Sequence, residues 1–306
     1  MIKGALLLLT LILTSCSGMK NTERVLPKEG EEGCFVAVRD GLKIFVYEYV
    51  PGSNFLNTIY IISGITGINH KEERDIIEKL SNNENRVVVI HPRGTGYSEG
   101  KRGDDNNLDD FIGDYVEIIK SDKFYNDRTG KVILYGHSMS CAVALVVGNE
   151  LQKIDALIMV NPPYKLKPVK GMSPGFGDYL KYIGYYIFAP HIPIVNMGGD
   201  PATIEDDADR DESYKRNRDT LLVKYFSMHY MNESKRVMDA MVRNARLADY
   251  PLMLIYGERD KLVEKAGCDE IFAAWRGENK KYIVISGGSH GKSTAIKGVD
   301  KILPLI

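Results

Sequence analysis

The chain has little of the features that mark several specialised protein classes. Its 306 residues hold four cysteines, too few and too scattered for a disulfide framework or a zinc cluster. The charges balance, with 40 Lys+Arg against 41 Asp+Glu, so the chain has no broad basic excess of the kind that binds nucleic acid. Its 29 glycines and 12 prolines exclude a collagen-like or disordered chain. These absences leave a globular protein with one large domain or two small ones.

No apolar run approaches the roughly 20 residues that a membrane-spanning helix needs. The N-terminus nevertheless has a higher share of apolar residues than the rest of the chain. Lys3 precedes the apolar run 5–13, and small residues follow, which is the order of a secretory signal. Residues 13–16 (LTSC) resemble the lipobox of bacterial lipoproteins, in which the cysteine thiol is acylated and the signal is cut before it. The resemblance implies a signal peptide over 1–15 and lipidation, palmitate included, at Cys16.

Two alternatives for the N-terminus stay open, a plain secretory signal with an incidental cysteine and a buried N-terminal helix. With the lipid, we expect a membrane-anchored protein of the bacterial cell envelope, in an inner or outer membrane that the sequence does not distinguish. The polar residues of segment 16–32 predict a flexible lipidated tether between the lipid and the domain.

Beyond the tether, short apolar strands alternate with helices. Asp40-Gly41 between two apolar alternations predicts a hairpin. We expect strands at 34–38, 42–50, 58–62, 86–90, 131–135, 154–160, 251–256 and 281–285, and helices at 70–80, 108–119, 138–151 and 269–275 and from 292 onward. Such alternation predicts the α/β class, with a mostly parallel central sheet and helices on both faces.

The alternation stops in the middle of the chain. Residues 164–248 are aromatic and helical in pattern, without a strand signal. They predict a helical cap or lid inserted between a first part of the core, 33–163, and a second part, 249–306. Within it, the apolar stretch 179–188 indicates either packing on the core or an acyl-chain tunnel or membrane-facing lid. The acidic run 205–212 lacks the EF-hand pattern and predicts a solvated loop.

A nucleophile motif lies between a predicted strand and a predicted helix. Gly136-His137-Ser138-Met139-Ser140 resembles the nucleophile elbow G-x-S-x-G, with Ser140 in place of the last glycine. A turn this tight strains the backbone of the nucleophile, so the flanking residues must be small. We therefore predict that Ser138 is a catalytic nucleophile.

A serine nucleophile needs a base, and the base needs an orienting carboxylate. Asp260 and His290 each follow a predicted strand, in the chain order Ser, Asp, His, at the edge where α/β sheets build their sites. Glu258 is the rival for the acid, and a surface-loop histidine is the alternative for His290. Two backbone amides are expected to form an oxyanion hole, those of Met139 and Ile65. A simple glycine turn is the alternative for the loop that carries Ile65.

A further segment makes a family resemblance specific. Residues 91–100 (HPRGTGYSEG) are similar to the D-x-R-G-x-G-x-S segment of the α/β-hydrolases, with His91 in place of the aspartate. We expect Arg93 to brace neighbouring loops. With 136–139 (GHSM) and 217–221 (NRDTL), the chain from about Cys34 onward resembles the monoacylglycerol lipase, lysophospholipase and serine aminopeptidase branch of the α/β-hydrolase superfamily.

The resemblance implies a serine esterase or lipase that cleaves carboxylic esters with an apolar acyl part, of the monoacylglycerol or lysophospholipid kind. The reaction would run through a Ser-His-Asp triad and an acyl-enzyme, with no metal and no organic cofactor. A serine aminopeptidase or thioesterase with the same triad is the alternative, and a non-catalytic binding protein on this fold is the alternative of another class. The departures at Ser63, His91 and Ser140 concern substrate specificity more than the reaction.

One motif competes with this interpretation. Residues 286–293 (SGGSHGKS) nearly match the phosphate-binding P-loop but lack its first glycine. A P-loop nucleotidase also needs a later strand with a magnesium-binding aspartate, and few residues follow Ser293. The sequence therefore favours the hydrolase and leaves the oligomeric state undetermined.

Overall fold

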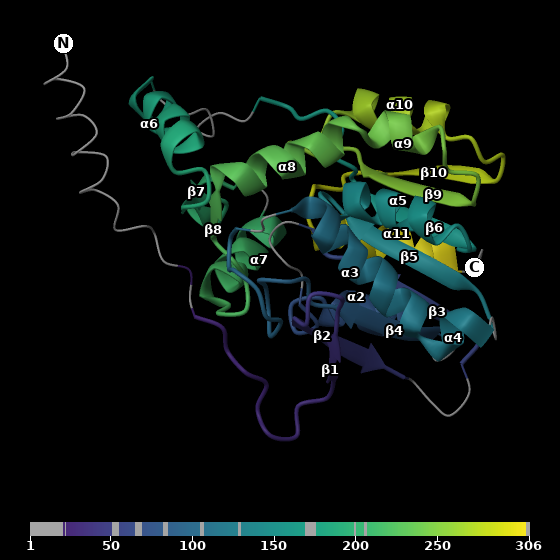
Figure 1. Cartoon of the computed structure of the whole chain (residues 1–306). Coiled ribbons are helices and arrows are strands. Elements are labelled where there is room, and N and C mark those ends of the chain that lie inside the picture. The colour runs from purple at the N-terminus through teal and green to yellow at the C-terminus, as the bar shows by residue number, and fades with distance from the viewer. Residues whose placement is uncertain are drawn as a thin grey trace, which may run out of the picture.

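The computed structural model describes residues 21, 23–50, 55–64, 69–81, 85–104, 107–127, 130–168, 176–198, 200–204 and 207–303 (Figure 1). The predicted signal peptide, Cys16 and Ile65 lie outside the described residues. Within the described part, no helix combines the length and the apolar character needed to cross a bilayer.

The core of the fold is an eight-stranded sheet in the order β1-β2-β4-β3-β5-β6-β9-β10. Only β2 runs antiparallel to its neighbours, β1 and β4, and the other pairs are parallel. This arrangement confirms the predicted fold class. The strands are β1 (Cys34–Ala37), β2 (Lys43–Tyr49), β3 (Asn57–Ile61), β4 (Asn85–Ile90), β5 (Val132–His137), β6 (Ala156–Val160), β9 (Leu252–Gly257) and β10 (Lys280–Ile285).

Helices cover both faces of the sheet because its central strands are apolar on both sides. On one face pack α2 (Arg74–Ser81) and α11 (Lys292–Ile302), against side chains such as Ile59 and Ile61. Tyr60, between them in the chain, points into the core of the other face, as the period of two along a strand requires. That face is covered by α3 (Leu108–Ser121), α4 (Lys123–Asp127), α5 (Ser140–Leu151), α9 (Met241–Ala245) and α10 (Lys265–Ala274).

The segment between β6 and β9 forms the cap, with one difference from the expectation. It contains α6 (Phe176–Phe188), a 3-10 turn (Pro201–Thr203), α7 (Asp207–Arg218) and α8 (Met228–Asp239), but also two strands that pair antiparallel, β7 (Pro193–Asn196) and β8 (Tyr225–Ser227). Strands of three or four residues are too short to show alternation in the sequence. Helices α8 and α9 also lie against α3 and α5, so the end of the insertion packs on the core.

The acidic run is helical rather than a loop from Asp207 onward, which corrects the prediction for its described part. Asp207 and Asp209 stand in the first turn of α7, and three basic side chains stand in its last turn. That distribution complements the helix dipole and stabilises both ends. The helix therefore forms although it carries almost no apolar residue.

The segment before β1 is bound to the domain and is not free. The side chain of Asn21 accepts hydrogen bonds from the N–H groups of Lys224 (3.0 Å) and Tyr225 (2.9 Å). Its amide nitrogen donates to the carbonyls of Tyr225 (2.7 Å) and Arg102 (3.2 Å). In Figure 1 the segment descends on the β8 side of the molecule before it enters β1. The prediction of a flexible tether is therefore wrong for the described part of 16–32.

Candidate active site

The turn between β5 and α5 holds Ser138 in a strained conformation, with φ at +54°. Non-glycine residues rarely adopt this region, and it recurs at functional turns. A Cβ on Gly136 would lie 2.9 Å from backbone atoms of Ser140 and Cys141, so only glycine fits there. Ser140 is buried and fits in place of the glycine of the elbow motif. The sharp turn presents the Ser138 side chain at the carboxyl edge of the sheet.

Three side chains from separate loops meet at this edge. The Ser138 hydroxyl donates to Nε2 of His290 at 2.8 Å, and Nδ1 of His290 donates to Oδ2 of Asp260 at 2.7 Å. The other oxygen of Asp260 accepts the N–H groups of Leu262 (2.7 Å) and Val263 (2.8 Å). The residues selected from the sequence thus form one continuous hydrogen-bonded chain.

The environment of Asp260 keeps this carboxyl group ionised. Its side chain is fully buried, and burial alone would raise its pKa. The hydrogen bond and charge of His290, together with the backbone N–H groups, outweigh burial and hold the pKa below its usual value. The rival acid, Glu258, is exposed and accepts from Ser286 and Gly287 (2.9 Å each), away from the imidazole. Asp260 is therefore the group that can stabilise an imidazolium.

Two further residues position His290 through its backbone. His137 donates from Nε2 to the His290 carbonyl at 2.7 Å, and Asn161 donates from Nδ2 to the same oxygen at 3.1 Å. Asn161 also donates to the carbonyl of Ser289 (3.2 Å) and accepts the N–H of Gly257 (2.8 Å). Burial and the neighbouring His290 lower the pKa of His137 to about 3, so this imidazole is neutral.

Sequence reasoning assigned no role to either positioning residue. Asn161 directly follows β6, at the same edge as the triad, and its positive φ of +50° is strained for a non-glycine residue. In the sequence, the signal for a role of Asn161 in the site was its place directly after an apolar strand. Its link to loops almost a hundred residues or more further along the chain appears only in the fold.

The oxyanion side of the site is described in part. Met139 stands at the N-terminus of α5, where backbone N–H groups point outward without helical partners. A Cβ on Gly64 would lie 2.8 Å from the nitrogen of Ser140 and 3.1 Å from the Cβ of Met139, so the loop after β3 contacts the elbow. The second donor, Ile65, lies outside the described residues, and its role stays a prediction.

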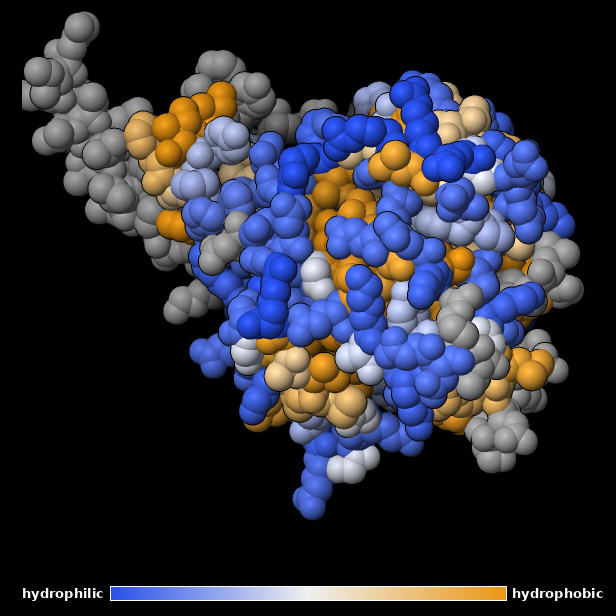
Figure 2. Space-filling model, turned by 45° about the vertical axis from the view of Figure 1, so that its right-hand side comes forward, coloured by the Kyte–Doolittle hydropathy of each residue, from blue (hydrophilic) through white to orange (hydrophobic). Residues whose placement is uncertain are grey.

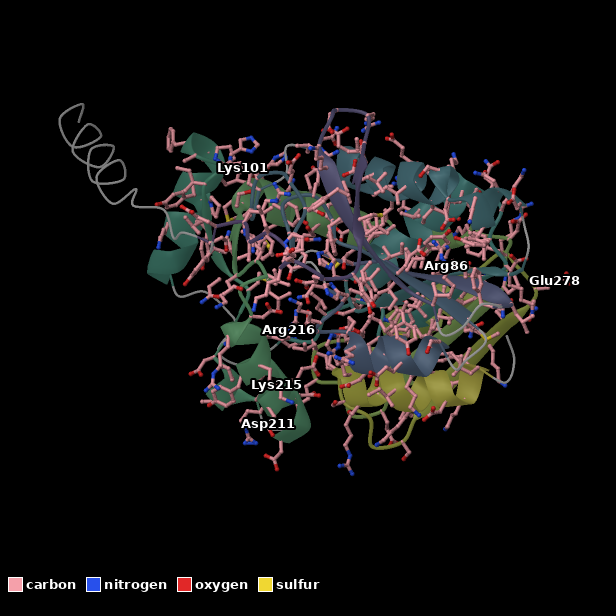
Figure 3. The ribbon with its side chains drawn as sticks, turned by 90° about the horizontal axis from the view of Figure 1, so that it is seen from below. Arg86, Lys101, Asp211, Lys215, Arg216 and Glu278 are labelled. Atoms are coloured by element: carbon pink, nitrogen blue, oxygen red, sulfur yellow. The ribbon has the colours of Figure 1, made fainter. Side chains whose placement is uncertain are left out.

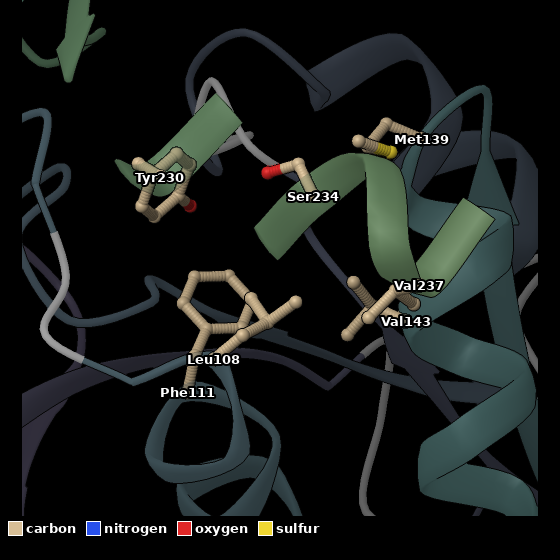
Figure 4. Close-up of a pocket in the computed structure, with 7 residues that line it drawn as sticks. All are labelled: Leu108, Phe111, Met139, Val143, Tyr230, Ser234 and Val237. Carbon is tan, nitrogen blue, oxygen red and sulfur yellow. The ribbon is translucent and has the colours of Figure 1, made fainter. Parts of the chain in front are cut away.

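A small apolar pocket opens beside the elbow (Figure 4). It lies between α3, α5 and α8, and it has room for about one water molecule. Its walls are formed by Leu108, Phe111, Met139, Val143, Tyr230, Ser234 and Val237. Met139, one of these walls, directly follows Ser138 in the chain. Among the described residues, no cluster of three His, Cys, Asp or Glu side chains could hold a metal ion.

The cap touches the catalytic loop through α7. The Ser289 hydroxyl, next to His290, donates to Oδ1 of Asp209 at 2.8 Å. Further along the helix, Arg216 forms an ion pair with the mostly buried Glu72 at 2.8 Å. Figure 3 shows Arg216 on the side of α7 that faces the core, with Asp211 and Lys215 farther from it. The cap and the loop that carries the histidine therefore form one connected structure.

Arg93 braces neighbouring loops, as expected. Its guanidinium binds both carboxylate oxygens of Asp114, each at 2.6 Å, and Asp40 at 2.9 Å. These bonds join α3 to the turn of the β1–β2 hairpin. Such a paired fork holds the segment 91–100 in place with more geometric precision than a lysine could.

His91, which replaces the aspartate of the resembled motif, belongs to a buried chain of hydrogen bonds. Its Nδ1 lies 3.2 Å from the backbone nitrogen of Tyr97, and its Nε2 lies 3.1 Å from Nδ1 and 3.4 Å from the backbone nitrogen of His70. His70 then donates to Glu31 at 3.3 Å. Burial lowers the pKa of His70 to about 4 and that of His91 well below its usual value. Both imidazoles are therefore neutral.

Glu31 supplies a negative charge near position 91, where the resembled D-x-R-G-x-G-x-S motif has an aspartate. Burial opposes its ionisation, but hydrogen bonds from Lys71 and Tyr97 outweigh it and lower its pKa to about 2. Lys71 lies 2.7 Å from the carboxylate. A carboxylate from the N-terminal segment thus serves this region in place of one at position 91.

The P-loop alternative finds no support in these contacts. Lys292, the lysine of that near-match, lies 3.7 Å from the buried carboxylate of Glu73, and its side chain is mostly buried. Beyond β10, the described chain contains only α11. The loop 286–291 instead delivers His290 to Ser138.

Comparison with known proteins places the chain in a family. The model of the family described as serine aminopeptidase, S33, a hydrolase family, matches residues 56–292, which is most of the chain. The chain belongs to this hydrolase family. A curated relative, a monoacylglycerol lipase of Mycolicibacterium smegmatis, is 23% identical over 189 residues, which cover 59% of this chain and 62% of the relative. The chain thus matches less than two thirds of that relative's length.

Solved structures share the fold of this α/β-hydrolase. A monoglyceride lipase from Saccharomyces cerevisiae superposes with a TM-score of 0.73 at 15% identity, covering 95% of this chain and 98% of the other. The monoacylglycerol lipase of Paleococcus ferrophilus gives a TM-score of 0.64 at 18% identity, covering 86% and 97%. A thioesterase domain from the curacin biosynthetic pathway gives 0.61 at 15%, covering 89% and 99%. At these identities the likeness concerns the fold alone.

Proposed function

We propose that the protein is a serine hydrolase that cleaves carboxylic esters with an apolar acyl part, of the monoacylglycerol or lysophospholipid kind. The observation that carries this proposal is the hydrogen-bonded chain from Ser138 through His290 to Asp260, with distances of 2.8 and 2.7 Å. This chain suits nucleophilic attack, because His290 and the backbone N–H groups hold the pKa of Asp260 below its usual value and because Nε2 of His290 lies within hydrogen-bond distance of the serine hydroxyl.

The reaction follows from these positions. Ser138 Oγ attacks the ester carbonyl as His290 takes its proton, and the tetrahedral oxyanion is held by the amide of Met139 and by the predicted donor Ile65. His290 then gives the proton to the departing alcohol, which leaves an acyl-enzyme. Water, deprotonated by His290, attacks the acyl-enzyme and frees the carboxylic acid. The steps need no metal and no organic cofactor.

The walls of the pocket support an apolar acyl group over an aminoacyl group. Five of its lining side chains carry no oxygen or nitrogen, and no acid that could hold an ammonium group is among the seven. An aminopeptidase needs such an acid near the nucleophile, because an unpaired ammonium group is costly to bury. The names of the lipase relatives point in the same direction.

Covalent labelling and a substrate panel test this proposal. A fluorophosphonate probe should label the wild type and fail to label Ser138→Ala; labelling that persists in the variant would refute the nucleophile. Monoacylglycerols and aryl esters of rising chain length should then be compared with aminoacyl amides and thioesters. We expect the highest kcat/KM for esters, and a preference for aminoacyl amides would overturn the lipase assignment.

We also propose that lipidation of Cys16 holds the protein on a membrane of the bacterial cell envelope. Because Asn21 is bound to β8, only the four residues 17–20 separate Cys16 from the domain, and the five Cα–Cα steps between them reach at most about 18 Å. β8 pairs with β7, which follows α6. The exposed side chains of α6 include Ile183, Tyr186, Ile187 and Phe188, and Figure 2 shows hydrophobic surface at this end of the molecule. A short tether on this side would bring that surface to the lipid.

Detergent-phase partitioning of the full chain and of Cys16→Ala tests the anchor. The wild type should enter the detergent phase and the variant should stay in the aqueous phase. Equal partitioning would contradict lipidation. Separation of inner from outer membranes would then give the location.

A further inference from the structure

The pocket beside the nucleophile contains a hydroxyl group that the described protein leaves without a partner. Ser234, on α8, is 2% exposed, and its Oγ is buried and makes no hydrogen bond to another group of the described protein. Figure 4 shows this oxygen at the pocket wall, pointing toward the side of Tyr230. The nearby walls from Leu108, Phe111 and Val237 are hydrocarbon and offer it nothing to bind.

This isolation is unusual for a serine in a helix. Such a hydroxyl normally bonds to the carbonyl one turn earlier or to water, and the large majority of buried side-chain polar atoms find a partner. A buried hydroxyl without a partner lowers the stability of the fold by about 1–3 kcal/mol. An alanine at position 234 would avoid this loss, because it has no polar group to desolvate. A polar group held in an apolar pocket at this cost fits an occupant that completes its hydrogen bond.

We propose that Ser234 is a specificity-determining residue, which selects acyl groups that carry a hydroxyl or keto oxygen close to the ester carbonyl. This inference rests on the proposed ester hydrolysis and names its substrate class more closely. Ser234 and Met139 line the same pocket, and Met139 follows Ser138 in the chain. An acyl group whose first carbons entered this pocket would reach Ser234 from the carbonyl that Ser138 attacks.

The size of the pocket limits the acyl group. It has room for about one water molecule as it stands, so only a short segment enters without displacing a wall. Met139, an unbranched and adaptable side chain, is only partly buried and forms one of those walls. The hydrogen bond from Ser234 would thus select for a substituent on the first few carbons of the acyl chain.

The test compares three aryl esters, of butanoic, 2-hydroxybutanoic and 3-hydroxybutanoic acid. For the wild type and each variant, the kcat/KM of a hydroxylated ester is divided by the kcat/KM of the butanoate ester. When this ratio is compared between two enzymes, the intrinsic reactivity of the esters cancels. We expect Ser234→Ala to lower this ratio roughly tenfold for at least one hydroxylated ester while butanoate turnover stays equal or rises. The matched control is Ser121→Ala, which removes a hydroxyl at the end of α3 that bonds Ile118 and should leave the ratio unchanged.

The outcomes separate the inference from the proposal on which it rests. A ratio that is the same in wild type and Ser234→Ala overturns the inference, and so does an equal loss for all three esters, which would mark a structural role. The inference is also overturned if Ser234→Ala instead changes the preference between glyceryl butanoate and methyl butanoate, because Ser234 would then bind the alcohol part of the ester. If the wild type hydrolyses no ester and resists fluorophosphonate, the proposed function itself fails.

Discussion

Replacement of Asn161 by glycine should lower both the stability of the fold and the rate of catalysis. Asn161 joins three loops at the carboxyl edge, because its side chain binds Gly257 on one side and the carbonyls of Ser289 and His290 on the other. Glycine adopts the observed φ of +50° without strain, so the substitution removes the side chain and leaves the backbone geometry available.

The loss of stability follows from the hydrogen bonds that each partner of Asn161 retains in the variant. The His290 carbonyl retains the bond from His137 (2.7 Å), and the Ser289 carbonyl retains that from Thr294 (2.8 Å). The N–H of Gly257 loses its side-chain partner in a buried place, which costs about 1–3 kcal/mol. The added freedom of glycine in the unfolded chain costs about 0.4–1 kcal/mol, and relief of the strain at the positive φ offsets that cost, as it does in the control described below. The free energy of unfolding should therefore fall by about 1–3 kcal/mol.

Denaturant unfolding at constant pH measures this loss. The chain has one tryptophan, Trp275, which is 3% exposed and reports the exposure of the core by its fluorescence. The matched control is Gln152→Gly, since Gln152 also has a positive φ (+60°) but is exposed at a helix end, with no side-chain bond to lose. This control should unfold at the wild-type midpoint or slightly above it.

Activity gives the second readout. With one of its two donors removed, the His290 carbonyl is held less firmly, so kcat toward an ester should fall about tenfold or more, with a smaller change in KM. If Asn161→Gly has the unfolding midpoint and the kcat of the wild type, and Gln152→Gly also matches the wild type, the positioning role of Asn161 is refuted.

Three further predictions concern the same site and its surroundings. Asp260→Asn should reduce kcat by about a thousandfold to ten-thousandfold, measured by ester hydrolysis, because His290 loses its orienting charge; a loss below tenfold would contradict the triad. Because the pKa of His70 is lowered to about 4 in the fold, its neutral form stabilises the protein above pH 6.5, and about 3 kcal/mol is lost as the pH falls from 6.5 to 4; unfolding curves of His70→Gln should lack this part of the slope. Gly136→Ala should lower kcat by about a hundredfold in a folded protein, since its Cβ would displace the elbow, whereas Ser140→Gly should stay active.

Local patterns were enough for the architecture and for the residues of the triad. The alternation of apolar strands and helices predicted each strand of the large sheet, because a parallel sheet buried on both faces needs continuous apolar runs. The elbow around Ser138 was visible because a strained turn admits only small neighbours. Asp260 and His290 could be selected because the carboxyl ends of parallel strands meet at one edge.

Other features depend on contacts between distant segments and left no local pattern. The strands β7 and β8 are stabilised by pairing across some thirty residues, and neither alternates long enough to be seen alone. Asn21 is polar and lies in a polar segment, so its sequence context is that of a free tether. Only its fit between Arg102 and the start of β8, where four hydrogen bonds converge on its side chain, distinguishes it from a residue of a free tether.

The amino-acid sequence by itself therefore determined the class of the fold and selected Ser138, Asp260 and His290, the three side chains that the structure joins by hydrogen bonds, since each selection depends on short-range periodicity or a local turn. The tertiary structure alone decided which groups hold those residues in place. His137 and Asn161 bind one carbonyl of the histidine loop, and Glu31 supplies from the N-terminal segment the charge that His91 lacks. The physical reason is that a hydrogen bond or an ion pair depends on distance in space, and segments far apart in the chain become neighbours only when the chain folds.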